Sequence, residues 1–304
     1  MTVQLVRHLD PDTVAEVLSL ARAAADTDSI YPLAEEVVLR LRHGGDPPPV
    51  HLLARAGRQL QGYAQVVADA AQGATGELVV HPRWRRHGTG RALVTAAIDV
   101  AERDPAGRLQ LWAHGDHPGA AALAASLGFT RARVLYRLRR PLTTPVDEPV
   151  LPAGVTLRMF RPGADDEAWL ALNARAFADH PEQGRWTARD LRLRMGEPWF
   201  DPAGFLLAER AGRLVGFHWT KIHPGDRDGG PVGEVYVLGV DPAAHASGLG
   251  TALTLAGLRH LRERGMDRVM LYVDESNRAA VSLYTRLGFS QWSVDVTYAR
   301  GGSG

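Results

Sequence analysis

The sequence predicts an α/β protein (α+β in its mixed sheets) made of two similar halves, each a mixed central sheet flanked by helices. Three observations lead to this prediction. The length of 304 residues fits two domains of about 150 residues, and 45% apolar residues give each half a core. The same order of apolar runs and helical periodicities occurs twice. A segment with four prolines, "RRPLTTPVDEPVLPAG" at 139–154, separates them as a linker.

In the first half, the expected strands are short apolar or alternating runs bounded by turn residues, and the first two form a hairpin around "GRQ". These strands cover residues 51–56, 60–68, 75–82, 108–114 and 130–140. The expected helices repeat apolar residues at helical spacing over residues 90–104 and 118–129. Further helical segments precede the hairpin.

The second half repeats this order after its own leading helical segments. Its expected strands cover residues 205–210, 214–222, 233–242, 268–274 and 290–300. Its expected helices cover residues 248–264 and 277–289. The resulting boundaries are a first domain at 1–140, a linker at 141–152 and a second domain at 153–304.

The repeat is most regular around two glycine pairs that lie 160 residues apart. Gly88 and Gly90 match Gly248 and Gly250, and "SLGF" at 126–129 matches "RLGF" at 286–289. Chance glycines would not keep such spacing, so the chain contains an internal duplication.

Composition excludes several classes of protein. The formal charge of +1 indicates no nucleic-acid tail and no membrane patch. The chain has no cysteine, which excludes disulfides, thiolate nucleophiles and Cys-based metal sites. No segment has the pattern of a signal peptide or a membrane span. We therefore expect a cytoplasmic protein with no nucleic-acid or membrane partner. We also expect a monomer that acts on a small molecule without a metal. Lys221 is the single lysine among 35 basic residues, through either genome bias or a need for a compact charge.

Each glycine pair follows a strand and opens a helix. The first turn of a helix leaves backbone N–H groups unpaired, and the helix dipole is positive there. Glycines let these N–H groups approach a diphosphate closely. A tight turn without a ligand would explain one such pair, but two copies in the same context favour an anion site. Arg85 and Arg86 give the first loop more positive charge than the second has.

The first loop, "RRHGTG" at 85–90, resembles the Gln/Arg-x-x-Gly-x-Gly/Ala signature of GCN5-related N-acetyltransferases. The resemblance implies two tandem GNAT-fold domains and binding of the acetyl-CoA pyrophosphate at this loop. The second loop, "HASGLG" at 245–250, departs from the signature because it begins with histidine and lacks the arginines. Its phosphate contacts would rest more on backbone N–H groups.

The second half also carries "HPEQGRWT", "GFHWTKIHP", "GEVYVLGVDP" and "LYVDESNRAAVSLYTRLGF". These segments are similar to tandem members of that family in actinobacteria, which acetylate the cysteinyl amine of a small thiol. The resemblance implies direct attack of the amine on acetyl-CoA, with no covalent enzyme intermediate.

The same resemblance implies that Glu234 is the general base and Tyr284 the general acid. At the 160-residue offset the first half has Ala74 and Ala124 instead, so only the second half would be catalytic. From the residues alone, a surface charge at Glu234 and a packing role for Tyr284 remain alternatives. The first domain would bind acetyl-CoA without turnover.

The implied substrate ligands are carboxylates, a lysine and a tyrosine, which suit an ammonium group and hydroxyls. They are Glu35, Glu182, Lys221, Glu234 and Tyr272. The register of the resemblance at Glu35 is fixed only to within one residue, so the adjacent Glu36 remains the alternative ligand.

The implied acetyl-CoA ligands are strand residues that pair backbone to backbone with the cofactor, followed by loop residues at its diphosphate. In the second half they are Leu238, Gly239, Val240, His245, Ala246, Ser247, Gly248, Leu249, Gly250, Thr251 and Asn277. In the first half they are Leu78, Val79, Val80, Arg86, His87, Gly88, Thr89, Gly90 and Arg91.

Two other functions remain open. A tandem acetyltransferase for another amine, such as an aminoglycoside or a peptide N-terminus, would use the same carboxylates. An acyl-CoA-binding sensor without turnover would need neither Glu234 nor Tyr284.

Overall fold

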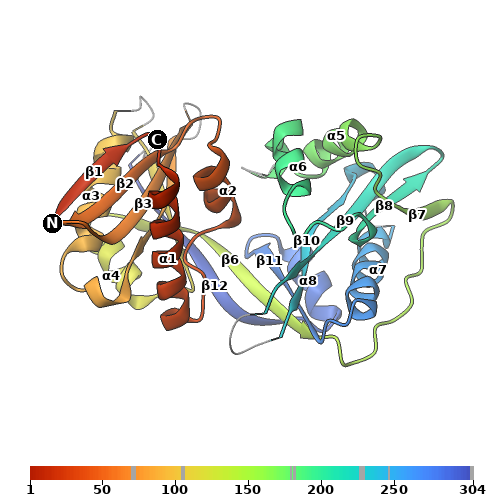
Figure 1. The fold of residues 1–304 in the computed structure, drawn as a ribbon. Coiled ribbons are helices and arrows are strands. Elements are labelled where there is room, and N and C mark those ends of the chain that lie inside the picture. The colour runs from red at the N-terminus through yellow and green to blue at the C-terminus, as the bar shows by residue number, and fades with distance from the viewer. Residues whose placement is uncertain are drawn as a thin grey trace. The chain divides into compact units, whose positions relative to one another are not determined.

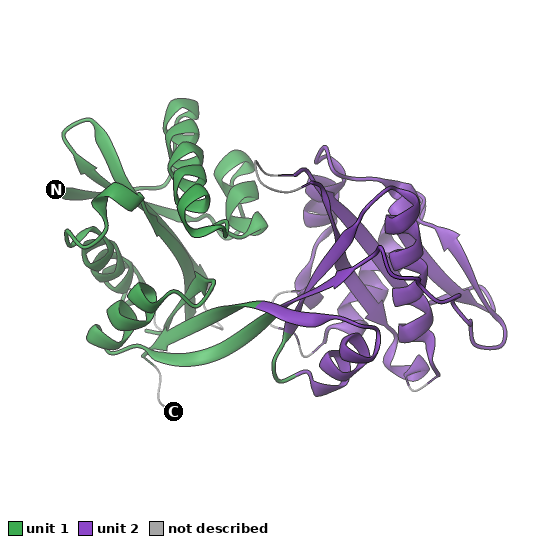
Figure 2. Cartoon of the chain, turned by 90° about the horizontal axis from the view of Figure 1, so that it is seen from below, with its two compact units in different colours: residues 1–136, 274–276, 293–304 green, residues 137–273, 277–292 purple. Residues whose placement is uncertain are grey.

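The computed structural model describes residues 1–69, 73–103, 107–178, 180, 183–225, 230–245 and 247–301. The chain forms two compact units (Figure 2). Unit 1 consists of Met1–Tyr136, Asp274–Ser276 and Ser293–Gly304, and unit 2 of Arg137–Val273 and Asn277–Trp292. The units therefore differ from the continuous halves 1–140 and 153–304, because the end of the chain belongs to unit 1.

Unit 1 contains most of the first repeat (Figure 1). Its strands are β1 (Thr2–Val6), β2 (Val50–Ala56), β3 (Gln59–Asp69), β4 (Gly73–Val80), β5 (Leu109–His114), the start of β6 (Thr130–Pro141) and most of β12 (Ser290–Arg300). Its helices are α1 (Pro11–Asp28), α2 (Glu35–His43), α3 (Thr89–Ala101) and α4 (Pro118–Ser126), with a 3-10 turn at Pro82–Trp84.

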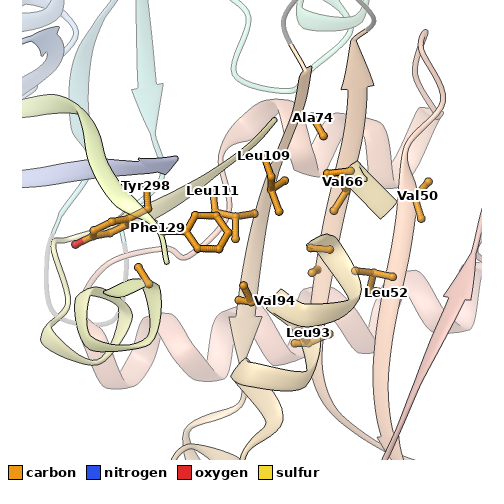
Figure 3. Close-up of a cluster of buried hydrophobic side chains, with 14 of the residues drawn as sticks. Val50, Leu52, Val66, Ala74, Leu93, Val94, Leu109, Leu111, Phe129 and Tyr298 are labelled. Atoms are coloured by element: carbon orange, nitrogen blue, oxygen red, sulfur yellow. The ribbon is translucent and has the colours of Figure 1, made fainter. Parts of the chain in front are cut away.

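The sheet of unit 1 runs in the order β1-β2-β3-β4-β5-β12. The β4–β5 pair is parallel, whereas β5 and β12 pair antiparallel from His114 opposite Asp295 to Leu109 opposite Arg300. One face packs on α3 and α4, and Val296 and Tyr298 of β12 contribute to this core (Figure 3). The other face packs on α1 and α2. The C-terminal strand is thus part of the hydrophobic core of unit 1.

Unit 2 contains the rest of the chain. Its strands are the end of β6, β7 (Val155–Met159), β8 (Phe205–Arg210), β9 (Arg213–His223), β10 (Val232–Val240) and β11 (Arg268–Asp274). Its helices are α5 (Asp166–Ala176), α6 (Ala188–Met195), α7 (Leu249–Glu263) and α8 (Arg278–Arg286), with 3-10 turns at Gln183–Arg185, Pro202–Gly204 and Pro242–Ala244.

The sheet of unit 2 runs in the order β6-β11-β10-β9-β8-β7, with β10 and β11 parallel. One face packs on an aromatic core that includes Trp169 of α5 and Trp219 of β9. The other face packs on α7 through Leu249 and Leu253. The prediction of a mixed sheet flanked by helices, made twice, is confirmed.

Local sequence signals explain where several helices begin. Asp10 precedes Pro11 and accepts a hydrogen bond from the Thr13 N–H, which starts α1. Thr187 and Asp190 form a reciprocal capping box at α6. Over the described residues, no helix has both the length and the apolar character needed to cross a membrane.

Candidate active site

Three of the predicted substrate ligands lie on one face of neighbouring strands in unit 2. Lys221 of β9 stands directly opposite Glu234 of β10, and Glu234 pairs in register with Met270 of β11. Side chains alternate along a strand, so Tyr272 shares the face of Met270. The register therefore gathers Lys221, Glu234 and Tyr272 on the face covered by the aromatic core.

A β-bulge at Tyr236 interrupts β10 next to this set. The pairing with β9 shifts between Val235 and Val237 and then continues to Val240. The parallel pairing with β11 ends at Val235, five residues before β10 ends. Bulges bend a strand and commonly lie beside functional sites. Leu238–Val240 therefore continue β10 beyond the last residue that pairs with β11, and such a strand edge is the kind to which an extended ligand can add.

Glu234 is a buried carboxylate with a histidine partner. Only 5% of the residue is exposed, and its Oε2 atom lies 2.5 Å from Nε2 of His223. His223 is two residues beyond Lys221 on β9 and therefore lies on the same face. The sequence analysis missed His223, although the alternation from Lys221 along "KIH" could have indicated it.

Lys221 is held in an aromatic environment. It is 8% exposed, and its Nζ atom lies 4.4 Å from the ring centre of Trp199 and 5.1 Å from that of Tyr236. Such cation–π contacts stabilise a buried ammonium group. Tyr236 also accepts a 2.9 Å hydrogen bond from Nε of Arg194. The ammonium group of Lys221 therefore lies against two aromatic rings, which favours a specific role over genome bias alone.

Tyr284 lies on α8 and is buried. Its ring packs edge-on against Phe289, with ring centres 5.6 Å apart. Burial raises the pKa of Tyr284 to about 12, so the phenol keeps its proton throughout the physiological range. The packing and the hydroxyl can both contribute, and only a test that removes the hydroxyl separates them.

The loop before α7 has the geometry of an anion site. Gly248 is the N-cap of α7 with φ 85°, a left-handed conformation that favours glycine, and no side chain caps the helix. The first-turn N–H groups therefore remain for another acceptor. Ser247 donates to the Ala244 carbonyl at 2.7 Å, and Nε2 of His245 lies 3.2 Å from the Val240 carbonyl. These bonds fix the loop without occupying the helix end.

The loop before α3 repeats this backbone. Gly88 is the N-cap with φ 86° and again no side chain caps the helix. The charge of this loop differs from expectation, however, because the two terminal guanidinium nitrogens of Arg85 donate to the carboxylate of Asp28 at 2.7 and 2.6 Å. Arg91 donates to Ser126 at 2.9 Å. The expected charge advantage of the first loop thus no longer rests on Arg85, whose charge is balanced by Asp28, but Arg86 and Arg91 still contribute positive charge.

The counterpart of Glu234 is Thr75, not Ala74 as the constant offset indicated. Leu109 of β5 and Val269 of β11 are equivalent residues of the two units. Ala74 pairs with Leu109 and Gly233 pairs with Val269, so Gly233 is the counterpart of Ala74. The bulge adds one residue to β10. For the part of β10 that precedes the bulge, the sequence offset between the two units is therefore one residue shorter than the 160 residues found after it. Thr75 stands opposite Val67, as Glu234 stands opposite Lys221. Unit 1 therefore has Thr75 and Ala124 at the positions of Glu234 and Tyr284.

Unit 1 contains a buried ionic network that the sequence analysis missed. His114 of β5 lies between two carboxylates, with Nε2 3.3 Å from Glu77 and Nδ1 3.0 Å from Asp295. Glu77 accepts a 2.6 Å hydrogen bond from the Ala34 N–H at the start of α2, and Asp295 accepts one from the Gly115 N–H. Burial alone would lower the pKa of His114, but the two carboxylates raise it to about 9.

This network predicts a pH-dependent stability. A folded pKa above the unfolded value of about 6.5 contributes stability that is complete below pH 6.5 and lost as pH rises through 9. We expect His114→Gln to lower the free energy of unfolding at pH 6 by up to about 3 kcal/mol more than at pH 9.5. Urea unfolding of both proteins at these pH values measures this. A difference between the two proteins that stays constant with pH would contradict it.

The structure describes only some of the remaining predicted site residues. Glu35 is the first residue of α2, in unit 1, and the adjacent Glu36 pairs with Arg40 at 3.0 Å. Asn277 caps α8 by accepting from the Ala280 N–H. Glu182 and Ala246 lie outside the described residues. Within the described part of the chain, no cluster of three or more His, Asp or Glu is arranged to hold a metal ion.

Gly239 has a packing reason of its own. A Cβ atom there would come within 2.5 Å of the Phe217 ring, which lies against β10. The other strand residues, Leu238 and Val240, pack toward α7. Their side chains are thus engaged in the core, and only their backbone could pair with an added strand.

Each unit combines a mixed sheet, a parallel strand pair and a glycine-capped helix, and this duplicated architecture is that of a tandem GNAT-fold transferase. The acetyltransferase (GNAT) family model matches residues 15–129 and 168–289. The chain belongs to the GNAT family of acetyltransferases and is an acetyl-transferring enzyme.

The chain is similar to two curated relatives over nearly its whole length. It is 62% identical to a mycothiol acetyltransferase of Salinispora arenicola over 96% of this chain and 95% of that protein. It is 57% identical to a mycothiol acetyltransferase of Thermobispora bispora, over 99% and 100%. A tandem GNAT protein from the clavulanic acid biosynthesis pathway superposes with a TM-score of 0.76 at 23% identity, over all of both chains, which shows the shared fold.

Proposed function

We propose that this enzyme transfers the acetyl group of acetyl-CoA to the cysteinyl amine of desacetylmycothiol, the last step of mycothiol biosynthesis. The observation that carries the proposal is the Lys221–Glu234 pair at the splayed edge of β10, in a chain 62% identical to a mycothiol acetyltransferase. A buried carboxylate beside an open strand edge suits deprotonation of an amine that attacks a thioester held along that edge.

The residues around β10 and α7 fit acetyl-CoA as co-substrate. The backbone of Leu238–Val240 would pair with its pantetheine arm, and the uncapped first turn of α7 would hold its diphosphate. Residues His245 to Thr251 and Asn277 complete the proposed site. When bound, acetyl-CoA supplies the activated acyl group, and the chain supplies position and proton transfer.

Direct transfer needs two protons to leave the substrate nitrogen. Glu234 takes the first from the ammonium group, which frees the lone pair to attack the thioester carbonyl. The C–S bond then breaks, and Tyr284 gives its proton to the sulfur. Because its pKa of about 12 exceeds the value of about 8.5 for a free thiol, the phenol would regain a proton from the nitrogen in the same event. One proton ends on CoA and one in solvent.

The proposed substrate ligands are Glu35, Glu182, Lys221, Glu234 and Tyr272. Their carboxylates accept hydrogen bonds from the ammonium group and the sugar hydroxyls of such a substrate. For unit 1, we propose that Leu78–Val80 and Arg86–Arg91 bind acetyl-CoA without turnover. Thr75 and Ala124 stand there in place of the base and the acid.

The test is an assay of free CoA release with purified protein, acetyl-CoA and a panel of amines. Desacetylmycothiol should give the highest kcat/KM, well above an aminoglycoside or a peptide N-terminus. A higher kcat/KM with either of those amines would show that this amine, and not desacetylmycothiol, is the preferred substrate. Tight acetyl-CoA binding with no turnover on any amine would indicate a sensor.

Replacing Tyr284 by Phe removes only the hydroxyl. If the phenol protonates the leaving sulfur, we expect kcat to fall while the Kd for acetyl-CoA and the folding stability change little. Stopped-flow transfer and calorimetric binding measure the two quantities. An unchanged kcat with a lower Tm would instead make Tyr284 a packing residue of the Phe289 contact.

A further inference from the structure

The partner of Glu234 is placed between the buried carboxylate and solvent. The side chain of Glu234 is 6% exposed, whereas that of His223 is 34% exposed. Their facing atoms, Oε2 and Nε2, are 2.5 Å apart. A proton on the carboxylate therefore has a partly exposed imidazole within direct hydrogen-bond reach.

The reaction creates a need for such a route. Each turnover leaves one proton to be released to solvent, and a carboxylate that accepts it must lose it before the next cycle. We propose that His223 is the proton relay of Glu234, an inference that rests on the proposed role of Glu234 as base. His223 acts through the carboxylate and is a positioning and relay residue.

The proton balance of the relay is simple. Glu234 takes a proton from the substrate ammonium group, and a proton passes from Oε2 to Nε2 of neutral His223. The imidazolium then loses its Nδ1 proton to water, and exchange with water restores the starting tautomer. The carboxylate regains its charge, and no electrons are transferred. Histidine suits this role because its two ring nitrogens can accept and release protons on opposite sides.

Other polar groups share the strand face of Glu234. Lys221 of β9 stands directly opposite Glu234, Tyr236 lies in the adjoining bulge, and Tyr272 of β11 shares the same face. The imidazole of His223 lies on this face as well and contacts the carboxylate directly, Nε2 to Oε2 at 2.5 Å.

The duplication supports a functional origin for the pair. Along β3 of unit 1, the positions of Lys221 and His223 are occupied by Val67 and Asp69, and that of Glu234 by Thr75. The three polar residues therefore occur together in the unit proposed to be catalytic.

The experiment compares His223→Phe, His223→Gln, Glu234→Gln and the Glu234→Gln/His223→Phe double variant in steady-state acetyl transfer over many turnovers. We expect His223→Phe and His223→Gln to lower the rate roughly tenfold to a hundredfold, with KM for the amine nearly unchanged. Added imidazole should restore much of the rate, and the rate should now rise with buffer concentration, unlike that of the wild type. The double variant should be no slower than Glu234→Gln, which imidazole should not rescue.

Two results would overturn the relay. One is a wild-type rate in His223→Phe alongside a strong loss in Glu234→Gln, which would leave the base assignment intact. The other is a rate loss in both His223 variants that neither imidazole nor buffer relieves. Full activity of Glu234→Gln would instead remove the proposed base, and with it the premise of the relay.

Discussion

Glu234→Gln is expected to lower kcat by roughly 10²–10⁴-fold at pH 7. The amide keeps the shape of the side chain and can still contact His223, but it cannot accept the substrate proton. The α-amine of the substrate has an ordinary pKa of about 7.7–8.0, so a growing fraction is already neutral as pH rises. The loss should therefore shrink between pH 7 and pH 9, as single-turnover rates at each pH would show.

Glu77→Gln is the matched control for this variant. Glu77 is equally buried at 5% and also contacts a histidine, but it lies in unit 1. If loss of a buried carboxylate alone disturbed the enzyme, both variants would lose kcat. We expect Glu77→Gln to keep kcat within a few-fold while losing stability. Unchanged turnover of Glu234→Gln at pH 7 would refute the assignment of the base.

Gly248→Trp is expected to abolish turnover, whereas Gly88→Trp should keep most of it. Each glycine caps its helix with φ near 85°, and a Cβ at either position meets open space. The backbone strain of about 1–2 kcal/mol is therefore the same in both variants. The indole would fill the space beside the helix N-terminus where the diphosphate is proposed to lie.

Calorimetric titration with acetyl-CoA and steady-state rates distinguish the two units. Each variant should bind one equivalent fewer than the wild type, and only Gly248→Trp should lose activity. A Gly88→Trp protein that is folded, binds acetyl-CoA once and is inactive would mean that unit 1 carries the chemistry.

Several features of the fold could be predicted because they depend on local sequence. The strands, the hairpins and the two glycine-capped helices follow from alternation, helical spacing and the conformational freedom of Gly88 and Gly248. The resemblance to the acetyltransferase family rested on the same loops and is confirmed by the family match. Three of the residues that the resemblance named, Lys221, Glu234 and Tyr272, lie on one face of neighbouring strands, and their role in the site stays a prediction.

The sequence by itself determined the duplication, the order of elements and the class of enzyme, because each of these depends on patterns within short segments of the chain. Only the tertiary structure decided that β12 pairs with β5 in unit 1 and that the bulge at Tyr236 makes Thr75 the counterpart of Glu234. It also showed that the carboxylate of Asp28 binds the guanidinium group of Arg85. It alone brought His223 to Glu234, and His114 between Glu77 and Asp295. The reason is that strand neighbours and register depend on packing between distant segments, and a shift of one residue changes which side chains meet.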